Sequence, residues 1–300
     1  GFGTLGTVRD RLAAHGAPHG LGYETRALAR NARFSSTVFR MNPFHYHRAG
    51  SLNEAAQRLG SDDQARLLAG GMTLIPSLKH RLLAVSELID IARLPDLQEI
   101  RVQADAVWVG AAVKHQQVAA HAELAQALPA LAELAGLIGD PQVRARGTLG
   151  GSIANNDPAA DYPAAVLALG ATVVTTQREI AADDFFLGMF TTALAPGEVI
   201  RGVRFPRARQ SAYAKFRHPA SGYAMAGVFL ADFGAQGRRV AVTGATDAVC
   251  RWPQAEAAWQ AGQTPPPFAH EGLLSDIHAP ARYRAHLTGL MYAQALKQLR

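Results

Sequence analysis

The sequence has little cysteine and no long apolar run. Its 300 residues contain one cysteine, Cys250, so the chain cannot form an internal disulfide or supply the four thiolates that an iron–sulfur cluster usually takes. The longest nearly continuous apolar run, residues 164–174, is eleven residues long, well short of the roughly 20 that cross a bilayer. We therefore predict a protein of a reducing, cytoplasmic compartment with no transmembrane segment.

Basic residues are not gathered where a nucleic acid could use them. Of the formal net charge of +6, residues 1–40 contribute +4, from six arginines against Asp10 and Glu24, which leaves +2 for the rest of the chain. The remaining lysines and arginines are scattered singly and are not interleaved with aromatic residues, so we expect no nucleic-acid binding. Residues 1–40 are interpreted as an extension of unknown role.

Motifs that mark a self-contained catalytic centre are missing as well. The chain has no HExxH, no Cys/His cluster with zinc spacing, and neither GxGxxG nor GxxxxGK[ST]. No Ser–His–Asp set and no pair of catalytic carboxylates can be defended from spacing. We therefore predict no catalytic residue and no metal site on this chain, and expect any reactive chemistry to come from a cofactor.

Residues 146–163, RGTLGGSIANNDPAADYP, form what we call the second glycine segment. Gly147, Gly150 and Gly151 lie close together there, among hydroxyl, amide and carboxylate side chains. Successive main-chain amides in a glycine-rich turn make an anion-binding concavity that suits a diphosphate. The pattern predicts an exposed nucleotide loop that is not part of the core; a plain hairpin turn is the alternative.

Residues 69–74, AGGMTL, form the first glycine segment. They follow a predicted strand at 66–68 and lead to a predicted helix at 76–81. Ligands of α/β folds collect at the ends of strands, so this segment is a second candidate for the same ligand.

The order of predicted elements divides the chain. Residue 51 opens a helix with a capping box, Ser51 to Glu54, and strands and helices alternate as far as a boundary at 206–210. After it come three strands and then helices, which indicates a small α+β domain. The main predicted strands are 86–91, 106–112, 171–176, 198–205, 213–217, 227–233 and 238–243, and the main helices lie within 116–135, where two pieces are expected, and at 163–169, 254–260 and 279–299.

Both glycine segments resemble the paired FAD loops of the xanthine dehydrogenase and carbon monoxide dehydrogenase flavoprotein family. The resemblance rests on RLLAGGMTLIPSLKHRL from Arg66 and DPQVRARGTLGGSIANNDPAADYPAAVLALGA from Asp140. It extends to SELIDIARLPDL, to FFLGMFTTALAPGEVIRGVRFP from Phe185, and to LLSDIHAPARYRAHL from Leu273. It therefore covers residues 41–300.

The resemblance implies an α+β fold. An FAD-binding domain of the p-cresol methylhydroxylase and vanillyl-alcohol oxidase type is expected over residues 41–206, with subdomains at about 41–100 and 101–206. A small C-terminal domain, an antiparallel three-stranded sheet with helices, is expected over residues 211–300.

The resemblance also implies a set of cofactor-binding residues, each at a position that matches the family pattern. In this family the residue at Ser152 is more usually Asn or Asp, so a shorter hydroxyl contact is expected there. Lys215 matches a lysine near the flavin ring, where a cation stabilises the negative charge that develops on reduction. The full set is Leu68, Ala69, Gly70, Gly71, Met72, Thr73 and Leu74 from the first segment, Thr148, Gly150, Gly151, Ser152, Asn155 and Asp161 from the second, Ile138, Gly139 and Ile200 around the nucleotide, and Lys215.

The function implied is that of the medium, FAD-binding subunit of a molybdenum hydroxylase. Substrate reacts at a molybdenum cofactor on a large partner, two-iron two-sulfur clusters lie on a small partner, and FAD passes electrons to an external acceptor: a quinone, NAD or oxygen. A dimer of heterotrimers is expected, associated with a membrane only through partners and inactive toward substrate as an isolated chain. Two alternatives stay open: a flavin-free assembly subunit and a self-sufficient FAD oxidoreductase.

Overall fold

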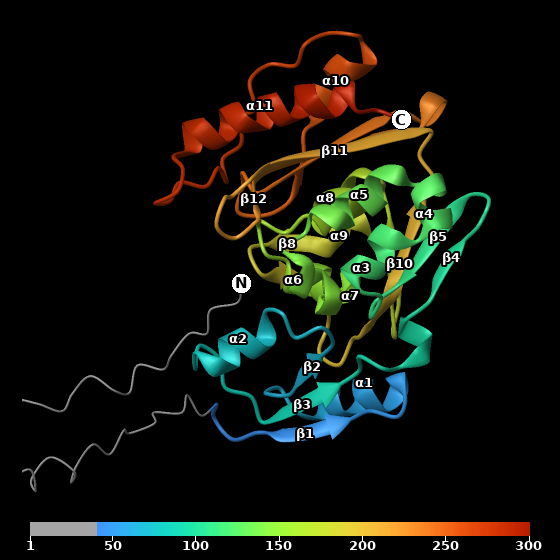
Figure 1. Ribbon diagram of the computed structural model, residues 1–300, viewed down its shortest axis with the longest axis vertical. Helices are drawn as coiled ribbons and strands as arrows, with labels where there is room; N and C mark the ends of the chain where they lie inside the picture. The colour runs from blue at the N-terminus through green and yellow to red at the C-terminus, as the bar shows by residue number, and fades with distance from the viewer. Residues whose placement is uncertain (1–40) are drawn as a thin grey trace, which may run out of the picture. The chain divides into compact units, whose positions relative to one another are not determined.

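The computed structural model describes residues 41–300, which form one compact unit; the extension predicted at residues 1–40 lies outside the described residues. The described chain is a mixed α and β structure, as predicted (Figure 1). Its strands form a three-stranded, a five-stranded, a four-stranded and a two-stranded sheet. None of the helices in this part has both the length and the apolar character that a membrane crossing needs.

The first sheet carries the first glycine segment. It is parallel, in the order β1 (His45–Arg48), β3 (Glu87–Asp90), β2 (Arg66–Leu68). Helix α1 (Leu52–Ser61) begins at the predicted N-cap, where the Ser51 hydroxyl accepts the Glu54 amide at 3.2 Å. The Glu54 carboxylate accepts the amide of Gly50 rather than that of Ser51, so the capping box is displaced by one residue. Beyond β2 the chain turns into helix α2 (Leu74–Lys79).

The five-stranded sheet has the order β4 (Ile100–Val102), β5 (Ala106–Gly110), β10 (Ile200–Pro206), β6 (Thr172–Thr175), β7 (Glu179–Ala181). The stretch expected to hold two helical pieces contains three, α3 (His115–Ala120), α4 (Ala122–Ala127) and α5 (Pro129–Leu137). The extra break occurs because the His121 ring caps α4 by accepting the Leu124 amide at 3.2 Å.

The second glycine segment is a helix rather than an open loop. Helix α7 (Leu149–Asn155) runs through it, between α6 (Pro141–Arg146) and α8 (Tyr162–Ala168). The prediction that the segment stays out of the core is wrong, because Leu149, Gly150 and Ile153 are buried. Two glycines in the first turn are tolerated because the Thr148 hydroxyl caps the helix and the Gly150 amide bonds to the Ala111 carbonyl, just beyond β5.

The C-terminal part is an antiparallel sheet covered by helices. The three predicted strands are present as β11 (Gln210–Arg217), β12 (Ala224–Asp232) and β13 (Arg238–Thr243), and a two-residue strand, β14 (Cys250–Arg251), adds a fourth. Helices α10 (Pro253–Gln260) and α11 (Ala281–Lys297), orange and red in Figure 1, pack on one face of this sheet and share a separate apolar core with it. The other face of the sheet contacts α5 and α8. The remaining elements are α9 (Ala182–Phe185), the hairpin β8 (Phe186–Gly188) and β9 (Thr191–Thr192), and the 3₁₀ turns η1 (Pro95–Leu97) and η2 (Gly234–Gln236).

Candidate functional site

The two glycine segments touch through their backbones. A Cβ atom placed on Gly70 would lie 2.8 Å from the Gly147 Cα atom and closer still to the Arg146 carbonyl oxygen. Gly71 has φ +72, the left-handed region that favours glycine. The fold therefore requires glycine where the first segment meets the second, and it brings the two candidate loops to one place.

The first segment presents free backbone amides. Within residues 41–300, the amides of residues 69–73 donate to no backbone oxygen, since the β2 ladder ends at Leu68 and the first helical bond of α2 is donated by Ile75. Met72 and Thr73 are exposed, and Gly70 and Gly71 are half-buried. A run of five such amides offers donors to an anion, the role that the sequence predicts for the second segment.

In the second segment, by contrast, successive amides are already bonded within the protein. Gly147 donates to Val143, Leu149 to Val113 and Gly150 to Ala111, at 2.7, 3.1 and 2.9 Å, and Gly151 donates to the Thr148 hydroxyl at 3.2 Å. The predicted nest of free amides is therefore wrong for this segment. It instead presents the exposed backbone of Gly151 and the half-buried side chains of Ser152 and Asn155.

Asp161 and Lys215 form a buried ion pair. The Lys215 ammonium lies 2.9 and 3.0 Å from the two Asp161 oxygens, and their side chains are 2% and 3% exposed. The Tyr213 hydroxyl donates to Asp161 at 2.5 Å. Burial raises the pKa of the Asp161 carboxyl, while the Lys215 charge and the Tyr213 hydrogen bond act in the opposite direction. Asp161 and Lys215, both predicted to bind the cofactor, therefore contact each other. The Asp161 carboxylate is bonded to Lys215 and Tyr213.

Three other predicted residues lie in different surroundings. Ile138 and Gly139 precede α6, and the Gly139 carbonyl accepts a hydrogen bond from Arg217, two residues beyond Lys215 on β11. Ile200 lies in the main core, where β10 pairs with β6. Ile138 and Gly139 are thus close to the Lys215 strand, and Ile200 is a core residue.

Comparison with known proteins identifies the family. Residues 42–208 match the family described as the FAD binding domain in molybdopterin dehydrogenase. The chain belongs to this family. It is similar to the nicotine 6-hydroxylase medium subunit of Paenarthrobacter nicotinovorans, 34% identical over 80% of this chain and 91% of the relative. It is also 40% identical to the carbon monoxide dehydrogenase medium chain of Hydrogenophaga pseudoflava, over 61% of this chain and 67% of the relative.

Solved structures agree with this assignment. The carbon monoxide dehydrogenase of Hydrogenophaga pseudoflava that lacks the Mo-pyranopterin moiety of its cofactor has a chain that superposes with a TM-score of 0.77 at 34% identity, over 86% of this chain and 97% of that one. Quinoline 2-oxidoreductase from Pseudomonas putida 86 gives 0.76 at 28% identity, over 86% and 97%. The chain is therefore an FAD-binding medium subunit of an oxidoreductase family.

The described residues fit an FAD-binding domain on their own geometry. A dinucleotide needs hydrogen-bond donors for its diphosphate, and the amides of residues 69–73, which donate to no backbone oxygen, can supply them. The close packing of Gly70 against residues 146–147 brings the second segment beside these donors. Polar atoms of the surrounding elements are also buried without partners within residues 41–300: His115 Nδ1, Asn156 Oδ1 and Tyr162 Oη. No group of three His, Cys, Asp or Glu side chains in this part of the chain is placed to hold a metal ion.

Three residues that contact or adjoin the predicted site residues were missed in the sequence. Tyr213 is one: its alternation with Lys215 on β11 places both side chains on one face, and that spacing could have revealed it. His115 is another, since its ring lies 2.5 Å from where a Cβ atom of Gly147 would be. Asn156, next to the predicted Asn155, is buried and donates to the Gly188 and Thr191 carbonyls at 2.7 and 2.9 Å, which fixes hairpin β8–β9.

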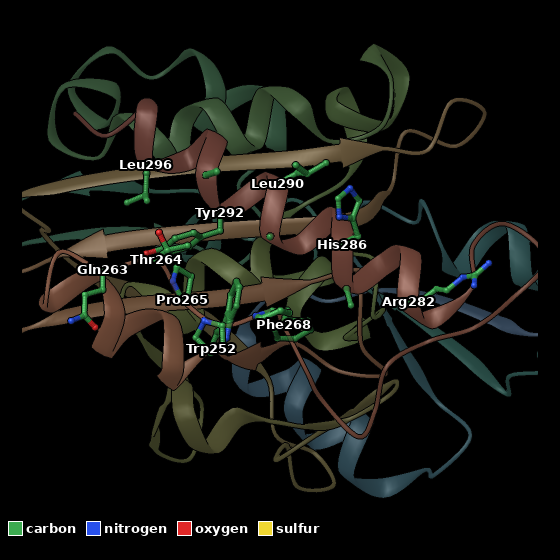
Figure 2. A pocket seen from close by; sticks show the side chains of 15 residues that line it. Trp252, Gln263, Thr264, Pro265, Phe268, Arg282, His286, Leu290, Tyr292 and Leu296 are labelled. Carbon is green, nitrogen blue, oxygen red and sulfur yellow. The ribbon is translucent and has the colours of Figure 1, made fainter.

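A large cavity lies away from these residues. It has a volume of about 630 Å³ and is formed by α11 and residues 263–268 (Figure 2). Trp252, Phe268 and Leu296 contribute to its apolar wall, and none of the residues predicted to bind the cofactor lines it. The cavity is therefore separate from the residues predicted to bind the cofactor.

Proposed function

We propose that this chain is the electron-transfer subunit of a heterotrimeric molybdenum hydroxylase. In this proposal it receives electrons from two-iron two-sulfur clusters on a small partner and passes them through FAD to an external acceptor. Substrate reacts at a molybdenum cofactor on a large partner. The observation that carries the proposal is the backbone contact between Gly70 and residues 146–147, beside five free amides.

The predicted residues of the two glycine segments other than Asp161, together with Lys215, have a part in holding the cofactor. The amides of residues 69–73 donate to the diphosphate, with Leu68 and Leu74 at the ends of the turn. Gly151, Ser152 and Asn155 approach from the second segment, behind which Thr148 and Gly150 fix the start of α7. FAD, when bound, takes up and releases electrons, and Lys215 supplies a cation beside its ring.

The division of labour among subunits follows from what this chain lacks and from its relatives. Cys250 alone cannot ligate a cluster, so the clusters belong to a partner. Relatives named as medium subunits or chains belong to enzymes named for nicotine, glyceraldehyde and carbon monoxide. Such different substrates support a substrate site on another subunit. We also propose the cytoplasmic location, the dimer of heterotrimers and the domain boundaries given above.

The test is the flavin content of the purified full chain. We expect a flavin absorption spectrum, release of FAD on denaturation in a ratio near one per chain, and no turnover of substrate by the chain alone. Co-expression with the neighbouring large and small subunits is expected to give a complex that contains molybdenum and iron, in which substrate bleaches the flavin band. A folded chain that neither purifies with FAD nor binds added FAD contradicts the proposal.

A further inference from the structure

The ion pair between Asp161 and Lys215 joins the FAD-binding domain to the C-terminal sheet. Asp161 is the N-cap of α8, and Lys215 lies on β11 with its ammonium also donating to the Gly222 carbonyl at 3.0 Å. Tyr213, two residues earlier on the same face of β11, bonds to Asp161. The lysine is thus held from two elements, and its carboxylate partner is itself held by a third group.

The environment of this pair is unusual for a lysine. Most lysines keep the ammonium in water, whereas that of Lys215 is enclosed. Gly227 on β12 leaves room for the Tyr213 side chain, since a Cβ atom on Gly227 would lie 2.6 Å from the Tyr213 hydroxyl oxygen. Burying two charges costs solvation energy that apolar residues of similar size avoid, so such a pair is weak support for a role in stability alone.

We propose that Asp161 is a positioning residue that both holds and electrically compensates the Lys215 ammonium, and thereby sets the reduction potential of FAD bound beside it. The proposal rests on the proposed function, in which Lys215 lies by the flavin ring. In this proposal the flavin ring is next to a nearly neutral ion pair and not next to a free positive charge.

The sign of the effect follows from the charges. Reduction by two electrons adds negative charge to the ring, so a positive neighbour favours the reduced state and a negative one disfavours it. Asp161→Asn keeps the shape and removes the compensating charge. The affinity for reduced FAD is then expected to increase at least tenfold relative to that for oxidised FAD. For a two-electron couple this raises the reduction potential by about 30 mV.

The experiment is an equilibrium reductive titration of the FAD-loaded full chain, with dithionite and a dye of known potential. Wild type, Asp161→Asn and the double variant Asp161→Asn/Lys215→Met are compared. The double variant removes both charges and is the safeguard if the single variant does not fold. We expect the ratio of its affinities for reduced and oxidised FAD to stay within twofold of the wild-type ratio, because the pair it removes is nearly neutral.

The matched control is Asp183→Asn. Asp183 is also an ion-paired carboxylate, bound to Arg239 at 2.7 Å, and Arg239 in turn bonds to Leu167 near the opposite end of α8. For the Asp183→Asn variant, the ratio of the affinities for reduced and oxidised FAD is expected to stay within twofold of the wild-type ratio. The inference is overturned if the reduction potential does not rise in Asp161→Asn, or if it rises as far in Asp183→Asn. A tenfold change of the affinity ratio in the double variant overturns it as well. Absence of FAD from the wild-type chain would instead overturn the proposed function.

Discussion

The backbones of Gly70 and Gly147 lie so close together that a single methyl group does not fit between them. A Cβ atom on Gly70 would be 2.8 Å from the Gly147 Cα atom, a separation that real Cβ atoms do not tolerate. The contact joins segments that are 77 positions apart in the sequence. It places the five free amides of the first segment beside the start of α7, where a diphosphate can be held from both sides.

Gly70→Ala is therefore expected to force the two segments apart. We expect FAD affinity to fall at least tenfold and the free energy of unfolding to fall by roughly 1–3 kcal/mol, the usual cost of overpacking. FAD release assays and urea titration measure the two effects. Gly289→Ala in α11, where a Cβ atom meets nothing within 4 Å, is the control, and there helix propensity predicts a gain of up to about 1 kcal/mol. Unchanged FAD affinity in Gly70→Ala would contradict the role given to the contact.

His115 makes stability depend on pH. Burial, and then the nearby Arg144 guanidinium, lower the pKa of this ring to about 4 from 6.5. Between these values the unfolded chain binds more protons than the folded one, so stability is present above pH 6.5 and is lost as the pH falls toward 4. At 1.36 kcal/mol per unit, His115 accounts for a loss of about 2 kcal/mol between pH 7 and pH 5.

The measurement is urea unfolding at pH 7 and pH 5 for wild type and His115→Gln. The variant replaces the ring with a group that does not titrate in this range. Its loss of stability between the two pH values is expected to be smaller than that of wild type by about 2 kcal/mol. Equal losses would show that other groups account for the acid sensitivity.

Two neighbouring asparagines are expected to separate stability from cofactor binding. Asn156 has φ +44, is buried, and holds hairpin β8–β9 through two hydrogen bonds. Asn156→Ala is expected to cost roughly 2–3 kcal/mol, from the unsatisfied carbonyls and the left-handed backbone. Half-buried Asn155 is predicted to contact FAD, so Asn155→Ala should change stability by less than about 0.5 kcal/mol and weaken FAD binding. Thermal unfolding and FAD titration of both variants check this, and the reverse pattern would refute it.

Arg284 is expected to be the main polar link between α11 and the sheet beneath it. It is 5% exposed and donates to the Met225 and Gly244 carbonyls at 2.9 and 2.8 Å and to Asp276 at 2.6 Å. Arg284→Met is expected to lower the free energy of unfolding by roughly 3 kcal/mol, since buried carbonyls lose their donors. Arg282→Met, on the exposed side of the same helix, should change it by less than about 0.5 kcal/mol. Urea titration compares the two, and equal effects would exclude the link.

Local features of the fold were well predicted because their causes are local. Strands β2 and β13 have the predicted bounds, and α1 starts at the predicted serine cap. The error at residues 116–135 has a local cause as well: His121 acts as an N-cap, a role the sequence pattern did not suggest for histidine. The helical state of residues 149–155 was missed because Gly150 and Gly151 disfavour a helix by themselves, and contacts with distant residues decide the outcome.

The sequence by itself determined the family, and it predicts the location of the cofactor site. The two glycine segments and their flanking strands and helices are short-range patterns that can be read directly, whereas Lys215 is predicted from the family resemblance. The tertiary structure decided which groups are free to bind. The second segment gives its amides to Val143, Val113, Ala111 and the Thr148 hydroxyl, and Asp161 binds residues of β11 more than 50 positions away. A polar group's availability depends on whether folding brings it a partner, and most of these partners lie far along the chain.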